Sequence, residues 1–148
     1  HLLAANDEGL KAMAESNVTA VLLPATALSL RKPYAPAKKM IELGVPVALA
    51  TDCNPGSCYC ESMEVVFRLA VLGMGLSVEE AFVASTINAA YAIGMASLVG
   101  SLEKGKKADF VVLEGETPGV IAYHLGWFNV KEVYKMGQEV SLGVGTCL

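Results

Sequence analysis

Residues 48–57 read ALATDCNPGS, an apolar run that ends in one acid and then breaks into turn-forming residues. Residues 45–51 have the pattern of a strand buried on both faces. Asp52 follows this strand, at the end where parallel barrel enzymes carry their catalytic groups. A carboxylate in such a place is costly unless it is paired or bound to a cation. The segment therefore predicts a cation or a proton beside Asp52; a carboxylate that only caps the following loop is the alternative.

The overall composition is that of a packed globular protein. Of 148 residues, 53% are hydrophobic and 18% are charged, and the net charge is −4. This length allows one ordinary domain with a sizeable core. The charge gives no reason to expect a nucleic-acid partner, and no apolar run is long enough to cross a bilayer. The sequence shows no secretory signal, so we expect a cytoplasmic protein with reduced thiols.

Helical and strand patterns alternate along the first part of the chain. The short links between them imply parallel strands joined by right-handed crossovers. We expect Pro24 to end the first strand and open a loop, and His1 to lie at the start of a strand-like stretch. The expected helices are 6–16, 36–43, 61–74, one that opens at the capping box Ser77-Val78-Glu79-Glu80, and 88–93; the expected strands are 18–23 and 45–51.

The pattern changes after Gly100. Residues 101–107 form a polar turn, residues 108–113 a strand, and residues 130–135 with 138–140 a hairpin. We therefore expect a small β region that follows an α/β region.

The loop after Asp52 offers groups that can recognise a ligand. Asn54 carries an amide, Gly56 a backbone N–H and Ser57 a hydroxyl, a set suited to a carboxylate or amide on a small molecule. The alternative is a tight turn in which Asn, Pro and Gly serve only the backbone.

Histidine and cysteine supply the remaining candidates. His1 is able to bind a metal or a reacting oxygen, but a lone histidine is more often a satisfied or exposed side chain. Cys53, Cys58 and Cys60 are spaced C-x4-C-x-C, which is neither a paired zinc-binding pattern nor an evident disulfide framework. A zinc site made of these thiols is an alternative to reduced, unliganded cysteines.

Several segments resemble the imidazolonepropionases, a family of metal-dependent amidohydrolases. The resemblance lies in Ala50–Ser57, in the run Ala20–Pro24 and in the segment Thr86–Gly94, and it continues in the late segment Tyr123–Gly126. The segment Gly100–Asp109 is similar to the corresponding segment of the whole amidohydrolase superfamily. The resemblance implies an α/β fold: strands six to eight of a (β/α)8 TIM-type barrel over residues 1–99, followed by part of a small β domain over residues 100–148.

The resemblance also implies an activity and a set of site residues. The parent enzyme hydrolyses 4-imidazolone-5-propanoate to N-formimidoyl-L-glutamate in histidine degradation, with one Zn²⁺ or Fe³⁺ at the barrel mouth. Asp52 matches the metal-binding Asp after the eighth strand. Asn54 and Gly56 match positions that hold the product, and Ser57 the position that holds the propanoate end of the substrate. His1 matches a histidine that steadies the reacting oxygen.

The chain departs from the family pattern where further metal ligands are expected. The family's His-x-His, its histidine after the fifth strand and the acid that serves as general base are all absent from these 148 residues. We therefore expect no catalysis by the chain alone. We also expect a dependence on other copies, as a homo-oligomer, or on a missing N-terminal part of the same enzyme. Another amidohydrolase, such as a deaminase, and a non-catalytic assembly module that keeps the fold are the alternatives.

Overall fold

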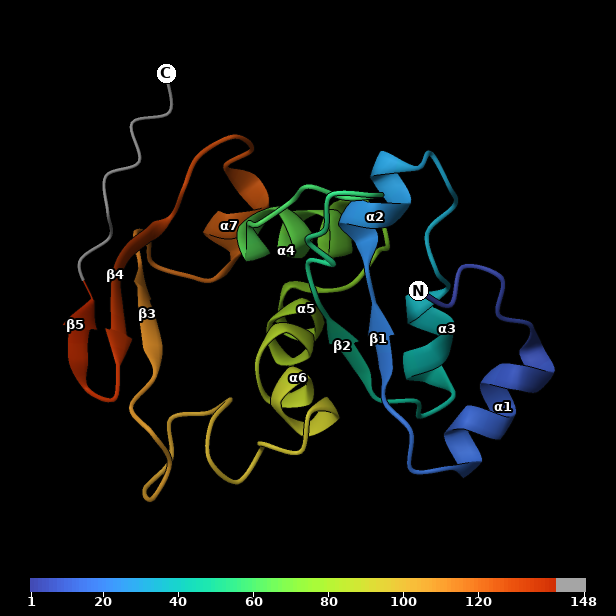
Figure 1. The fold of residues 1–148 in the computed structure, drawn as a ribbon, viewed down its shortest axis with the longest axis horizontal. Coiled ribbons are helices and arrows are strands. Elements are labelled where there is room, and N and C mark those ends of the chain that lie inside the picture. The colour runs from blue at the N-terminus through green and yellow to red at the C-terminus, as the bar shows by residue number, and fades with distance from the viewer. Residues whose placement is uncertain (141–148) are drawn as a thin grey trace.

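Two short parallel strands lie in the centre of the computed structural model, which describes residues 1–140 (Figure 1). They are β1 (Ala20–Leu22) and β2 (Val47–Leu49), and Ala20 pairs with Val47 and Leu22 with Leu49. All of β2 is buried, which agrees with its continuous apolar sequence. The predicted parallel pairing is confirmed.

Helices pack around this pair of strands. The helices that contact β2 include α3 (Ala37–Glu42), α5 (Val78–Ser85) and α6 (Ile87–Ala92), while α2 (Pro24–Ser29) contacts α4 (Met63–Leu72). The chain begins near α3, and α1 (Asp7–Glu15) lies at the outer edge (Figure 1). The largest apolar side chains of the core that are fully buried are Leu10, Leu22, Met40, Val45 and Val66.

The predicted helix starts are set by polar side chains. The Asn6 side chain accepts a hydrogen bond from the Gly9 amide at 2.8 Å, which caps α1. Ser62 caps α4 by accepting from the Val65 amide. At α5 both bonds of the capping box between Ser77 and Glu80 are present. These contacts satisfy backbone donors that a helix start otherwise leaves unpaired.

Two expectations for the N-terminal part are wrong. Pro24 does not open a loop: it occupies the first turn of α2, where its fixed φ suits a helix and its missing N–H is not needed. His1 does not begin a strand-like stretch, because the backbone makes a turn at Leu3 and Ala4 before α1.

The last described part of the chain forms an antiparallel sheet. Its strands are β3 (Phe110–Leu113), β4 (Val130–Lys135) and β5 (Gln138–Val140), in the order β3-β4-β5. Met136 and Gly137 have φ values of 53° and 76° in the turn between β4 and β5, as a two-residue hairpin turn requires. The predicted strand and hairpin are confirmed.

The sequence did not predict α7 (Gly119–Tyr123), a short helix between β3 and β4 that contacts α4.

A buried carboxylate joins α4 to this C-terminal part. Glu64 accepts hydrogen bonds from the backbone amides of Asn129 and Val130 at 3.0 and 3.1 Å. Its second oxygen accepts from the Asn129 side chain at 3.1 Å and from Arg68 Nη2 at 3.0 Å. Arg68 also donates to the carbonyl oxygen of Trp127. The Glu64 and Arg68 side chains are only 9% and 7% exposed, so the pair is shielded from water.

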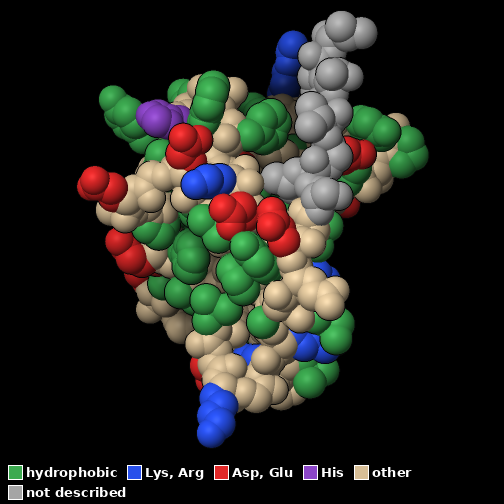
Figure 2. Space-filling view, turned by 90° about the vertical axis from the view of Figure 1, so that its left-hand side faces the viewer, with side chains coloured by type: hydrophobic (Ala, Val, Ile, Leu, Met, Phe, Trp, Pro, Cys, Tyr) green, Lys and Arg blue, Asp and Glu red, His purple; other side chains and the backbone are tan. Residues whose placement is uncertain are grey.

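The surface retains many apolar side chains. Figure 2 views the molecule from the side of the β3–β4–β5 sheet and shows hydrophobic side chains grouped together at the surface. The exposed large side chains include Tyr59, Leu72, Ile93, Leu102, Tyr123, Leu125, Trp127 and Phe128.

None of the helices within residues 1–140 is long and apolar enough to cross a membrane.

We expect Glu64→Ala to lower the free energy of unfolding by about 3–5 kcal/mol, because it leaves the Arg68 charge buried without its partner. Urea-induced unfolding measures this loss. Asp7→Ala serves as control, since it removes an exposed ion pair with Lys39 and should change stability far less. Equal effects of the two substitutions would contradict the structural role of Glu64.

Candidate functional site

Asp52 follows β2 after two intervening residues, Ala50 and Thr51. Its φ is 54°, in the left-handed region that Asp tolerates better than most residues with a side chain. The side chain is 28% exposed, so one part of the carboxylate reaches solvent and the rest is enclosed. A strained backbone of this kind is a recurrent feature of functional sites.

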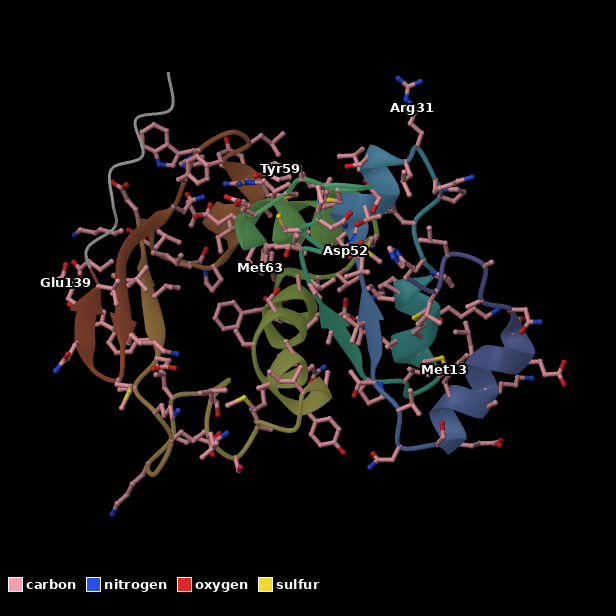
Figure 3. All side chains as sticks on the ribbon, in the orientation of Figure 1. Met13, Arg31, Asp52, Tyr59, Met63 and Glu139 are labelled. Atoms are coloured by element: carbon pink, nitrogen blue, oxygen red, sulfur yellow. The ribbon has the colours of Figure 1, made fainter. Side chains whose placement is uncertain are left out.

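A threonine from the neighbouring strand–helix unit holds this carboxylate. Thr26 Oγ1 donates to Asp52 Oδ2 at 2.7 Å, and Thr26 has no exposed surface. Thr26 lies in α2, which follows β1, so the parallel pairing of β1 and β2 brings both side chains to the same sheet edge. Figure 3 shows Asp52 where the two strands end, next to α2, whereas Arg31 extends away from the molecule.

The structure brings His1 to the same carboxylate. His1 Nε2 lies 3.6 Å from Asp52 Oδ2, which is longer than a hydrogen bond but within the range of an ion pair when the imidazole is protonated. The terminal amine donates to the carbonyl oxygen of Val21 at 3.4 Å. The His1 side chain is 48% exposed and so remains accessible to a ligand.

The loop after Asp52 is built around the Asn54 side chain. Asn54 Oδ1 accepts from the amides of Gly56 and Ser57 at 2.9 and 2.8 Å, and Asn54 Nδ2 donates to the Asp52 carbonyl at 2.6 Å. The Ser57 hydroxyl lies 3.2 Å from Asn54 Nδ2. The turn that the sequence offered as one alternative is therefore present. Roles of Asn54, Gly56 and Ser57 in ligand binding stay predictions.

The metal-binding capacity of the described residues is limited. Within residues 1–140 no three His, Cys, Asp or Glu side chains are grouped so that they could hold a metal ion. A catalytic zinc ion normally takes three protein ligands. Asp52 offers a hard oxygen ligand and His1 an imidazole at the same place, so the donor types fit a metal while the number of donors does not.

The cysteines do not supply the missing donors. Cys53, Cys58 and Cys60 are free thiols. Cys58 lies 3.7 Å from the Thr51 carbonyl oxygen, and Cys60 lies 3.8 Å from the Ser62 carbonyl oxygen. Desolvation and then the nearby Glu61 carboxylate raise the pKa of the Cys53 thiol, which disfavours the thiolate that a metal needs. The alternative of a zinc site made of these thiols is not supported.

Comparison with known protein families shows which family the chain belongs to. The sequence profile of the family described as "Amidohydrolase family" matches residues 1–140. The chain belongs to the amidohydrolase family. The membership in the amidohydrolases that the sequence resemblance implied is therefore confirmed, and Asp52 lies beyond the end of a strand of this fold.

The relatives that are most similar in sequence among those compared include imidazolonepropionases. The chain is 62% identical over 140 residues to that of Syntrophobacter fumaroxidans and 53% identical over 140 residues to that of Porphyromonas gingivalis. In both cases the match covers 95% of this chain and 33% of the relative. The chain therefore spans about one third of the length of these enzymes.

Solved structures of other amidohydrolases share the fold. A zinc-bound adenosine deaminase from Xanthomonas campestris superposes with a TM-score of 0.83 at 24% identity, over 94% of this chain and 35% of that one. Guanine deaminase from E. coli gives a TM-score of 0.79 at 21% identity, over 95% of this chain and 38% of that one. The α/β arrangement of this chain is thus that of part of a TIM-type amidohydrolase.

We expect Asn54→Ala to speed amide hydrogen exchange at Gly56 and Ser57 by about tenfold or more, because both amides lose their acceptor. Hydrogen exchange followed by mass spectrometry on residues 52–60 measures this change. Ser57→Ala is the matched control, because it removes only the hydroxyl and leaves both amide bonds. Unchanged exchange in Asn54→Ala would show that Asn54 does not organise this amidohydrolase loop.

Proposed function

We propose that this chain is the C-terminal third of an enzyme that hydrolyses 4-imidazolone-5-propanoate to N-formimidoyl-L-glutamate in histidine degradation. The observation that carries the proposal is the 62% identity to an imidazolonepropionase over 140 residues, a stretch that includes most of the described chain. The reaction is the opening of a cyclic amide C–N bond by water.

Asp52 is the residue proposed to bind the metal, either Zn²⁺ or Fe³⁺. A carboxylate oxygen at a strand end suits both ions, and the Xanthomonas adenosine deaminase with the same fold was solved with bound zinc. When bound, such an ion polarises the substrate carbonyl and activates water for attack. The remaining ligands must come from outside the described residues, since these hold no three-donor group.

The other proposed roles follow from the positions of the side chains. His1 lies close enough to Asp52 to steady the reacting oxygen of a substrate through its exposed imidazole. Asn54, Gly56 and Ser57 are proposed to hold the substrate and product. The half-buried Ser57 hydroxyl, which lies 3.2 Å from Asn54 Nδ2 and donates to Asn54 Oδ1 at 3.3 Å, is proposed to exchange these long contacts for the propanoate end of the substrate.

The site is proposed to be completed by chain that lies outside these residues. Within residues 1–140, β1 and β2 pair only with each other, and a strand edge with unpaired amides and carbonyls invites another strand. An open, largely apolar groove of about 970 Å³ runs along β2, α6 and β3. We assign β1 and β2 to the seventh and eighth barrel strands. The rest of the barrel is supplied by the missing N-terminal part of the same enzyme or by other copies in a homo-oligomer.

Two alternatives remain. Deamination of a cyclic amine is favoured by the structural likeness to adenosine and guanine deaminases, which shows the fold but not the substrate. A non-catalytic assembly module would keep the fold and bind no metal. Metal content separates this module from both enzymes.

The test uses a complete enzyme in which residues 1–140 replace the matching third of the Syntrophobacter imidazolonepropionase. We expect it to bind one transition-metal ion and to hydrolyse 4-imidazolone-5-propanoate. Asp52→Asn should lower kcat/KM by about 10²-fold or more, because it replaces a metal-binding carboxylate, and even the groups that only orient such ligands change activity up to about 100-fold. Glu116→Gln, which changes an exposed acid, is the matched control.

The substrate decides between the enzymes. Release of ammonia from a cyclic amine, without turnover of imidazolonepropanoate, would support a deaminase. Absence of both activities and of bound metal would support the assembly module.

A separate test uses the 148-residue chain by itself. We expect no hydrolysis of imidazolonepropanoate with added Zn²⁺, because the part of the chain that the structure describes, residues 1–140, offers too few donors for a catalytic metal. The assay follows loss of the substrate's absorbance. Robust turnover by the isolated chain would contradict the proposal that the site is completed from outside.

A further inference from the structure

The hydrogen bond between Thr26 and Asp52 joins a fully buried hydroxyl to a partly exposed carboxylate. The Thr26 hydroxyl donates to Asp52 Oδ2 at 2.7 Å, and Thr26 has no exposed surface. A hydroxyl has one proton to donate, and here it is given to the carboxylate. A charge-assisted bond of this kind is roughly twice as strong as a neutral one.

The two oxygens of Asp52 have different surroundings. Oδ2 is engaged by Thr26 and lies 3.6 Å from His1 Nε2. Oδ1 accepts no hydrogen bond from any residue in the described part of the chain, 1–140. The carboxylate is therefore held at one oxygen and open at the other, as a monodentate metal ligand requires.

The backbone of Asp52 is held independently. Asn54 Nδ2 donates to its carbonyl oxygen at 2.6 Å, and its φ of 54° fixes the direction in which the side chain leaves the strand end. The torsion that turns a carboxylate about its last bond is broad, so the backbone alone does not fix where the oxygens lie. Thr26 supplies the missing constraint.

We propose that Thr26 is a positioning residue, whose hydroxyl fixes Asp52 Oδ2 so that Oδ1 is presented to a metal ion. This inference rests on the proposed function, in which Asp52 binds a metal. Residues that orient a metal ligand from behind typically change metal affinity 10- to 100-fold when they are removed, whereas a bond that only stabilises the fold leaves affinity unchanged.

The experiment measures Co²⁺ binding to the metal-free complete enzyme, made as above. Thr26→Val keeps the shape and removes the hydroxyl; we expect it to weaken Co²⁺ binding about 10- to 100-fold and to alter the visible absorption spectrum of the bound ion. Thr26→Ser keeps the hydroxyl and should retain most of the affinity and the original spectrum. Thr86→Val is the matched control, because it removes a hydroxyl that donates to the Phe82 carbonyl away from the site.

The outcomes of the Co²⁺-binding experiment distinguish a positioning role of Thr26 from a purely structural one. Wild-type affinity and spectrum in Thr26→Val would overturn the proposal, as would equal weakening in the Val and Ser variants. If Thr26→Val and Thr26→Ala both fail to fold, as judged by circular dichroism, while Thr26→Ser folds, the bond serves the fold and the proposal fails. Absence of Co²⁺ binding by the unmutated enzyme would instead refute the proposed function itself.

Discussion

The register between β1 and β2 is the constraint on which the candidate site depends. Leu22 pairs with Leu49, and the ladder continues beyond the strands where the Ala50 amide donates to the Leu22 carbonyl at 3.2 Å. The two segments that follow these strands then leave the sheet at the same end: the segment after β1 enters α2, and the segment after β2 enters the loop at Asp52. A slip of one residue would turn Asp52 away and point the buried side chains of β2 to the opposite face. The contact between Thr26 and Asp52 exists because this register is fixed.

The loop that carries the site is held at both ends. It begins at β2, and after Cys60 the chain enters α4, which is tied to the C-terminal part through Glu64. A buried carboxylate with several donors cannot be released without leaving charges unpaired in the interior. The C-terminal β region is therefore bonded to α4, the helix that follows the site loop. Through α4 it helps to hold the end of that loop in place.

Local patterns in the sequence predicted the features that depend on neighbouring residues. Asp52 was found because a single acid ends an apolar run, and the start of α5 because Ser77 and Glu80 have capping-box spacing. The start of α2 was missed because Pro24 both ends strands and begins helices, and only the surrounding packing decides between the two. Local patterns do not predict the role of Thr26, because its partner Asp52 is 26 positions away. For the same reason they do not predict the Glu64–Asn129 contact, which spans 65 positions. The assignment to domains 1–99 and 100–148 stays a prediction, and residues 141–148 lie outside the described part of the chain.

The central claim is that Asp52 carries a metal ion on the oxygen that Thr26 leaves free. Crystals of the complete enzyme, measured at X-ray wavelengths on either side of the zinc and iron absorption edges, locate such an ion directly. The account predicts one anomalous peak about 2.0–2.2 Å from Asp52 Oδ1, with Thr26 still bonded to Oδ2. A peak bound by Cys53, Cys58 or Cys60, or no peak near Asp52 in active enzyme, would contradict it.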